Sequence, residues 1–523
     1  MSEITNSSEG LEWTGRLFGG ISDDIKRRLP HYVDDFKQGF HSKVAGSTLF
    51  LYFAALANAI AFGALTGEVT NNTIGIMEMV IVTAVGGIIF ALFSGQPLTI
   101  LGGTGPITIF TGMLYEACVQ LEISFLATYA WVGIWSGALM LICAFIDASA
   151  LMRYFTRFTD EIFAALISVI FIVEAVKDSS EPFINAFNVD DPDYSTAFLT
   201  VILALGTFTI AKFLKGSLNT PFLRRGFRNF LSDFGPSIAI VAMTFVAITF
   251  NEDVLLKTPA VPETIGTTTG RPWLVDIFEV PAWVIFASIG PAILATILLF
   301  LDQNITTRLV NSPDNKLKKG MGYHLDLAIV GLIILVSSFM ALPWIVAATV
   351  HSLNHVKSLA TMKVVEVGPG VKKEKIVSVR ENRVSGFMIH AMIAASLFFM
   401  AYVAYIPMAV LFGLFLYMGL ASLAGNQFYE RMMLWVTDPK LYPETHYLKI
   451  VPPREIHKFT VIQFLCFVGL WILKASKIGI LFPLLIAALV PIRLFVSRYF
   501  KKEHIDVMIA EDLEEEEKIR EIM

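Results

Sequence analysis

Residues 96–117, QPLTILGGTGPITIFTGMLYEA, decide the fold, because they are apolar and long enough to cross a membrane but are interrupted midway. Pro97 opens an extended-looking, β-branched stretch that leads into a step of small residues. Residues 342–360, LPWIVAATVHSLNHVKSLA, repeat this order, with Pro343 at the opening and Thr349 at the small-residue step. Irregular backbone at membrane depth is tolerated only where it lines a cavity, so the pair predicts a transport site.

Each interruption is expected to start a half-helix whose N-terminal N–H groups and dipole favour an anion. Pro106 fits the first turn of such a helix, where its missing N–H costs nothing. The alternative is a pair of kinked packing helices, since proline kinks are frequent in membranes. Two breaks at matching positions favour the half-helices.

The composition excludes a soluble protein. The 523 residues are 55% hydrophobic and 16% charged, with a mean hydropathy of +0.64, whereas soluble domains carry about 25% charged residues. Residues 1–30 are polar, so no cleaved signal peptide is expected. The sequence has no metal-ligand spacing, nucleotide loop or catalytic triad, and so predicts no enzyme activity, no cofactor, no resident metal and no nucleic-acid partner.

Apolar runs near the spanning length of about 20 residues predict fourteen membrane crossings. Two are the interrupted segments, and the others are 47–66, 74–94, 124–145, 162–177, 197–213, 235–250, 281–302, 324–342, 385–403, 405–423, 459–474 and 478–498. Fourteen divides into two sevens, and the interrupted segments are the third of each half. This arrangement predicts an all-α polytopic membrane protein with a 7+7 inverted repeat.

The distribution of basic residues supports cytoplasmic termini. With both termini inside, the outer segments hold only five of the forty Lys and Arg residues, namely Lys177, Lys257, Arg271, Lys474 and Lys477. The positive-inside rule predicts this asymmetry, and an odd number of crossings would destroy it.

One carboxylate ends an otherwise uncharged apolar run. In LLFLDQNITT (298–307), Asp302 follows residues 281–301, which contain no charge. An ionised Asp in hydrocarbon costs roughly 2.5–3.5 kcal/mol even on lenient scales, so protein, water or a cation must compensate it. Asp302 is therefore a candidate for an ion pathway.

Several motifs together closely resemble the bicarbonate transporter family, solute carrier family 4. In order, from about Gly15 to Arg493, they are FSGQPLTILGGTGPITIF, DASALMRYFTRFTDEIFAALIS, LLFLDQNITT, NKLKKGMGYHLDL, LPWIVAATVHS, VRENRVSG and FGLFLYMGLASLAGNQF. The resemblance implies core and gate domains, with homodimer contacts through the gate domains. The implied units are a short cytoplasmic segment (1–45), the core domain (46–150 and 276–404), the gate domain (151–275 and 405–500) and an acidic cytoplasmic tail (501–523).

The resemblance also implies a substrate site between the third and tenth segments. Asp302 and Thr349 would bind Na⁺, in keeping with the preference of that hard cation for oxygen ligands. A carbonate-type anion would lie at the half-helix N-termini, contacted by Thr104, Gly105, Pro106, Thr349, Val350 and His351. The pocket would also be lined by Asn58, Ala61, Gly103 and Ala348.

Some residues depart from the family pattern. His351 stands where the exchangers have Arg and the sodium-coupled members an apolar residue, while Ala61 replaces a usual Thr. His351 is interpreted either as a partly charged anion contact or as a neutral, hydrogen-bonded side chain. Two further interpretations are structural: Glu78 pairs within the core domain rather than binding an ion, and the charged residues between 147 and 161 form a solvated network.

The expected function is Na⁺-coupled bicarbonate or carbonate transport by alternating access, in the plasma membrane, with a role in pH regulation. Asp302 resembles the sodium-coupled branch, since the exchangers carry Glu there. The alternatives are a sodium-independent chloride/bicarbonate or other anion exchanger, which His351 keeps open, and a non-transporting scaffold or sensor. The expected partners are Na⁺, inorganic anions, the lipid bilayer and a second copy of the chain.

Overall fold

The structure is a computed structural model that describes residues 10–187, 193–250, 254, 256–262, 264–368, 371–443, 445–476 and 478–509. Within these ranges, nine helical segments are long and apolar enough to cross a membrane. They are α3 (Ser42–Val69), α4 (Ile76–Phe93), α6 (Phe125–Phe145), α8 (Tyr194–Gly216), α9 (Arg225–Thr249), α10 with α11 (Ala282–Ala287 and Ile289–Val310), α14 with its 3₁₀ extension (Val384–Ser396 and Leu397–Tyr405), α18 (Pro453–Ala475) and α19 with its flanking turns (Phe482–Val496).

A bent pair, α15 (Met408–Ser422) and α16 (Gln427–Met433), would make a tenth crossing, with 82° between the two helices. The other four crossings expected from the sequence are too short or too charged to be assigned by length and composition. They are α5 (Gly105–Gln120), α7 (Arg157–Phe187), α12 (Tyr323–Ser338) and α13 (Thr349–Leu359). Nine or ten apolar crossings are therefore established, and fourteen remains a prediction.

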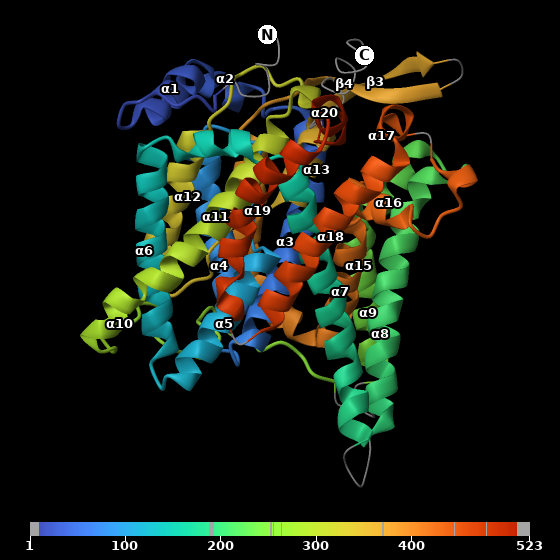
Figure 1. Ribbon diagram of the computed structural model, residues 1–523. Helices are drawn as coiled ribbons and strands as arrows, with labels where there is room; N and C mark the ends of the chain where they lie inside the picture. The colour runs from blue at the N-terminus through green and yellow to red at the C-terminus, as the bar shows by residue number, and fades with distance from the viewer. Residues whose placement is uncertain are drawn as a thin grey trace.

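Both termini lie at one end of the helix bundle (Figure 1). The small elements at this end are α1 (Gly19–Arg28), α2 (Tyr32–Lys37), the antiparallel hairpin of β3 (Ala360–Gly368) and β4 (Val371–Val379), α17 (His446–Ile450) and α20 (Lys502–Ile509). We call this end the terminal face. Most of the expected acidic tail (510–523), and also Lys477, lie outside the described residues.

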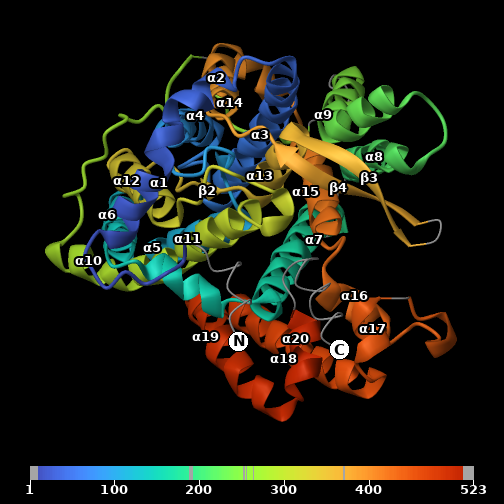
Figure 2. The ribbon, with the colours of Figure 1, turned by 90° about the horizontal axis from the view of Figure 1, so that it is seen from above.

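The helices form two sets that pack mainly within themselves (Figure 2). One set contains α3–α6 and α11–α14, and the other contains α7–α9, α15, α16, α18 and α19. At the seam between the sets, α3 contacts α9 and α15, α5 contacts α7, and α11 contacts α19.

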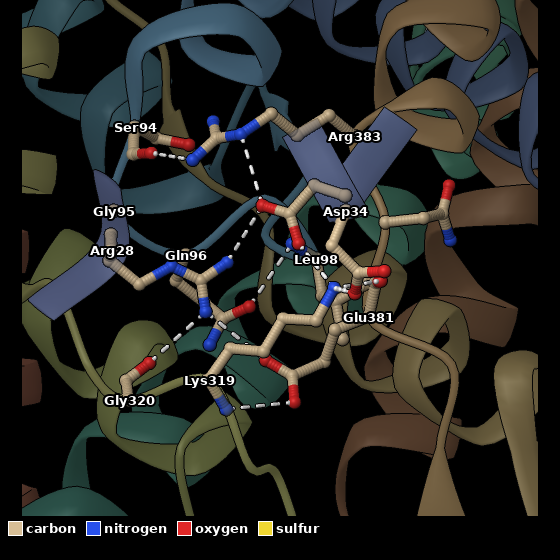
Figure 3. A network of polar contacts seen from close by, with 12 residues as sticks. Arg28, Asp34, Ser94, Gly95, Gln96, Leu98, Lys319, Gly320, Glu381 and Arg383 are labelled. Atoms are coloured by element: carbon tan, nitrogen blue, oxygen red, sulfur yellow. Dashed lines mark hydrogen bonds and ion pairs between the residues drawn. The ribbon is translucent and has the colours of Figure 1, made fainter. Parts of the chain in front are cut away.

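A buried cluster of charges ties the N-terminal helices to two loops of the first set (Figure 3). Arg28, only 2% exposed, lies 3.0 Å from Asp35 and 3.2 Å from Glu381. Lys319 Nζ and Arg383 Nε lie 2.7 and 3.2 Å from the Asp35 carboxylate. Glu381 also accepts hydrogen bonds from the backbone N–H groups of residues 318 and 319. Burial makes the cluster depend on every member, because removing one leaves another charge uncompensated.

We predict that Glu381→Gln lowers the stability of the detergent-solubilised protein by about 3–5 kcal/mol, because Arg28 then keeps a buried charge with one partner fewer. The control is Asp23→Asn. Asp23 pairs with Arg16 and Lys26 at 3.7 and 3.8 Å, and both pairs are exposed, so its loss should cost less than about 1 kcal/mol. Melting temperatures measure both. Equal shifts for the two variants would contradict the role given to the cluster.

Asp24 joins α1 to the start of α12. Its Oδ2 accepts hydrogen bonds from the backbone N–H groups of His324 and Leu325, at 2.8 and 3.0 Å. These N–H groups lie in the first turn of α12, where helical donors lack partners within the helix. Burial raises the pKa of Asp24 to about 7, against the lowering effect of the two backbone hydrogen bonds and of Arg27.

The raised pKa predicts a pH-dependent stability. Between about pH 4 and 7 the folded state holds a proton on Asp24 that the unfolded state has lost, so raising the pH through this window destabilises the fold. Asp24→Asn keeps an acceptor oxygen but does not titrate. The melting temperature of the wild type, relative to the variant, should fall from pH 5 to 7 and level off above pH 7. If the melting temperatures of the wild type and of Asp24→Asn changed in parallel with pH, the raised pKa of Asp24 would be ruled out.

The residues between 147 and 161 do not form a solvated network, so that sequence interpretation was wrong for three of them. Asp147 is buried and accepts a 2.8 Å hydrogen bond from the Gly20 N–H. Asp160 pairs with Arg308, and Glu161 lies 2.8 Å from the fully buried Arg431. The partners come from distant parts of the chain, so their local sequence gave no sign of them.

Candidate functional site

The two interrupted segments cross each other in the middle of the first helix set. Strand β1 (Leu101–Gly102) pairs in antiparallel register with β2 (Val346–Ala347). Just beyond the pair, the Ala348 N–H donates a 2.8 Å hydrogen bond to the Ile100 carbonyl. This pairing satisfies backbone groups that would otherwise be unpaired at membrane depth. The prediction of two broken segments is confirmed.

Each strand leads directly into a half-helix. Helix α5 begins at Gly105, with Thr104 as its N-cap residue and Pro106 in its first turn. Helix α13 begins at Thr349 after the extended residue Ala348. The free N–H groups of both helix starts therefore lie beside the antiparallel pair, as the sequence predicted.

Asp302 lies beside the first half-helix. Its side chain is 7% exposed, and its Oδ2 accepts a 2.7 Å hydrogen bond from the Thr104 hydroxyl. Because that hydroxyl donates its proton to the carboxylate, the Thr104 oxygen keeps its lone pairs free for a cation. The sequence assigned Thr104 to the anion and Thr349 to both the cation and the anion, whereas the hydrogen bond joins Asp302 to Thr104.

Two neighbours of Asp302 on α11 hold the second interrupted segment. Gln303 Oε1 accepts a 3.0 Å hydrogen bond from the Ala347 N–H, and Thr306 donates one of 3.2 Å to the Ala347 carbonyl. The hydroxyls of Thr306 and Thr349 lie 2.6 Å apart. Sequence reasoning missed Gln303 and Thr306. The signal was available, because Thr306 follows Asp302 by four residues and so shares its helix face.

His351 lies in the first turn of α13, on the side facing α3. Its Nε2 lies 3.1 Å from the Ala54 carbonyl. The next residue, Ser352, donates to the Ala348 carbonyl at 2.8 Å and accepts from the Ile100 N–H at 3.0 Å. One helical turn thus binds both interrupted segments and α3.

A cavity of about 820 Å³ extends from these groups to the terminal face. Nearly all the predicted site residues line it: Asn58, Gly103, Thr104, Gly105, Pro106, Asp302, Ala348, Thr349, Val350 and His351. Ala61 does not, because it is fully buried among other side chains. Near the terminal face the lining includes Arg157, Lys215, Arg308 and Lys357, all close to helix ends. The ligand roles themselves stay predictions.

Three phenylalanines close the opposite end of the cavity. Its lining on α3 ends at Phe62 and its lining on α7 ends at Phe171. These rings lie 5.8 Å apart between centroids, and Phe415 of α15 lies 5.9 and 5.8 Å from them. Phe62 belongs to one helix set and the other two rings to the second set. We call this aromatic contact the phenylalanine seal. It joins the two helix sets at the end of the cavity that lies away from the terminal face.

Glu78 has a structural role, as the sequence favoured. It is fully buried, accepts a 3.0 Å hydrogen bond from the Gly75 N–H, and accepts 2.8 and 2.5 Å bonds from the N–H and hydroxyl of Thr268. In the part of the chain that the structure describes, no group of three or more His, Cys, Asp or Glu side chains is placed to hold a metal ion.

These features define a multi-pass membrane protein with broken helices around a cavity, as in secondary transporters. A family model described as "HCO3- transporter integral membrane domain" matches residues 16–190 and 184–513. The chain belongs to this bicarbonate transporter family, solute carrier family 4.

Curated relatives from Rattus norvegicus include both anion exchangers and sodium-coupled proteins. The chain is 35% identical to the band 3 anion transport protein, over 97% of this chain and 56% of that protein. It is 37% identical to the electrogenic sodium bicarbonate cotransporter 4 (99% and 53%) and 35% identical to the electroneutral sodium bicarbonate exchanger 1 (96% and 52%). The chain spans about half the length of these relatives.

Solved structures support the fold at low sequence identity. The transmembrane domain of the cyanobacterial bicarbonate transporter BicA is 16% identical with a TM-score of 0.54, covering 82% of this chain and 97% of that one. The murine anion transporter Slc26a9 in the inward-facing state is 13% identical with a TM-score of 0.59, covering 93% and 71%.

The phenylalanine seal predicts a cost for a side chain at Gly105. A Cβ on Gly105 would lie 2.6 Å from Phe171 Cζ, so Gly105→Ala should lower stability by about 1–3 kcal/mol through overpacking. Adding Phe171→Leu should recover most of the loss. Gly46→Ala on α3 is the matched control, because a Cβ there meets no atom within 4 Å. A double variant no more stable than Gly105→Ala would disprove the contact.

Proposed function

We propose that the chain is a secondary transporter that couples Na⁺ to the movement of bicarbonate or carbonate across the membrane. The observation that carries this proposal is the position of Asp302. A nearly buried carboxylate lies 2.7 Å from a hydroxyl, at the start of one half-helix and on the cavity wall. No basic side chain among the described residues forms an ion pair with this carboxylate, and a buried carboxylate without such a partner favours a cation.

The proposed Na⁺ ligands are the Asp302 carboxylate and neighbouring oxygens. Na⁺ is a hard cation that prefers oxygen ligands, and the Thr104 hydroxyl keeps lone pairs for it. Thr349, the other predicted ligand, belongs to α13. Its hydroxyl contacts that of Thr306, which lies one helical turn after Asp302 on α11. The anion would lie at the N-termini of α5 and α13, next to the cation. Coupling follows, because each ion offsets the charge that would oppose the other.

The second candidate is a sodium-independent anion exchanger. The band 3 anion transport protein is as similar to this chain as the electroneutral sodium bicarbonate exchanger 1, so similarity alone does not favour coupling. Replacing chloride while base flux is measured separates the two candidates. Exchange requires chloride on the opposite side, and Na⁺ coupling requires Na⁺.

The proposed architecture has fourteen crossings in a 7+7 inverted repeat, with both termini cytoplasmic and the protein in the plasma membrane as a homodimer. The antiparallel pairing of β1 and β2 supports the inverted relation of the halves. The packing of the helices into two sets supports the proposed division into core and gate domains. With cytoplasmic termini, the cavity would open inward and the phenylalanine seal would close the outer side, and alternating access would reverse both.

Asp302→Asn tests the proposal. It removes the charge at nearly constant volume, so Na⁺-dependent recovery of intracellular pH in CO₂/bicarbonate medium should fall at least about tenfold, equivalent to about 1.4 kcal/mol. Asp233→Asn is the matched control, because Asp233 lines the same cavity but lies on α9. Its flux should stay within about twofold of wild type. Equal recovery with and without Na⁺ in the wild type would reject coupling.

A further inference from the structure

The hydrogen bond of His351 determines which ring nitrogen carries a proton. The Ala54 carbonyl, 3.1 Å from Nε2, can only accept, so Nε2 is the donor. In the neutral imidazole the other nitrogen, Nδ1, then carries no proton and presents a lone pair. His351 is therefore a hydrogen-bond acceptor at its second nitrogen.

That acceptor faces the cavity. The His351 ring lines the cavity together with Thr349 and Val350. Among the described residues, fully enclosed histidine nitrogens without a partner occur on His324, His390, His457 and His504, but His351 Nδ1 is not one of them. Because the ring borders the cavity and its Nε2 is engaged with α3, the accessible Nδ1 is the polar atom that His351 offers to a substrate.

The acceptor nitrogen of His351 differs in kind from the backbone N–H groups at the half-helix starts, which are hydrogen-bond donors. The starts of α5 and α13 present backbone N–H groups, which favour any anion. A lone pair at the same place repels an anion whose atoms are all acceptors, such as nitrate, chloride or carbonate. Bicarbonate differs, because one of its oxygens carries a proton. It can donate that O–H to Nδ1 while its other oxygens accept from the helix N-termini.

We propose that His351 is a specificity-determining residue, which selects a hydroxyl-bearing oxyanion, HCO₃⁻, over anions that have no proton to donate. The inference rests on the proposed transport of an inorganic anion at this site, but it does not depend on Na⁺ coupling. It assigns bicarbonate rather than carbonate as the transported species. No covalent or proton-transfer step is involved, because the proton stays on the anion.

Nitrate is the probe that isolates the O–H group, because it is planar, trigonal and singly charged like bicarbonate but has no proton. The full chain in liposomes, with equal Na⁺ on both sides, would exchange labelled bicarbonate against competing anions at pH 8. We expect nitrate to compete at least about tenfold more weakly than unlabelled bicarbonate, the value of about one net hydrogen bond. Equal competition in the wild type would overturn the proposal.

Two variants test the residue itself. In His351→Leu, bicarbonate and nitrate should compete equally well to within about twofold, so that the ratio of their competition strengths is close to one. His351→Arg supplies hydrogen-bond donors only, so this ratio should shift further toward nitrate. Leu353→Ala is the matched control, because Leu353 lies on the same helix and lines the same cavity, and it should keep the wild-type ratio. An unchanged ratio in His351→Leu would also overturn the proposal.

The readouts separate this inference from the proposed function. Selective exchange that ignores a Na⁺ gradient would reject Na⁺ coupling and leave the role of His351 intact. For any variant that does not transport, the rise in melting temperature with added bicarbonate or nitrate, at constant ionic strength, reports binding directly. In this measurement too, the bicarbonate concentration that stabilises the wild type should be at least about tenfold lower than the nitrate concentration that gives the same stabilisation.

Discussion

The structure depends on the antiparallel pairing of two broken segments at membrane depth. A chain that leaves the helical conformation there exposes N–H and C=O groups that lipid cannot satisfy. Strands β1 and β2 satisfy each other, and the Ala348–Ile100 hydrogen bond extends the pairing toward the half-helix starts. Two half-helices, α5 and α13, consequently begin just after these strands, and residues of both starts line one cavity. The polar groups at the half-helix starts are thus a direct consequence of how the backbone is satisfied.

Helix α11 connects the two broken segments to the Asp302 carboxylate. Gln303 and Thr306 hold the second broken segment, and Asp302 accepts a hydrogen bond from the first. A change at the carboxylate therefore acts on residues that also position the half-helices. In the proposed mechanism, cation and anion sites that share such supports would not behave independently, and this is the physical basis of the proposed coupling. The rings of Phe62, Phe171 and Phe415 meet at the seam between the helix sets, which the proposed alternating access would have to open.

The terminal face is held by buried charges rather than by apolar packing alone. Arg28, the last residue of α1, pairs with Asp35 of α2 and with Glu381 in the loop before α14. Asp24 of α1 accepts a hydrogen bond from the first turn of α12. Charges of this kind are tolerated only when every partner is present, so they fix one arrangement of the short N-terminal helices on the first helix set. The second set is tied differently, by Arg431 and Glu161. The Asp160–Arg308 pair, in turn, joins α7 of the second set to α11 of the first.

The sequence by itself determined the membrane class, the two broken segments, the cavity-lining residues around Thr104 and Thr349, and the need of the Asp302 carboxylate for a compensating partner. These follow from hydropathy, proline placement and the cost of a charge in lipid, all of which are local properties. The tertiary structure decided which groups meet: that Asp302 accepts a hydrogen bond from Thr104, that Ala61 is excluded from the cavity, that Asp147, Asp160 and Glu161 find partners far along the chain, and that His351 turns Nε2 to Ala54. Such pairings depend on the packing of helices far apart in the chain, and no local pattern records them.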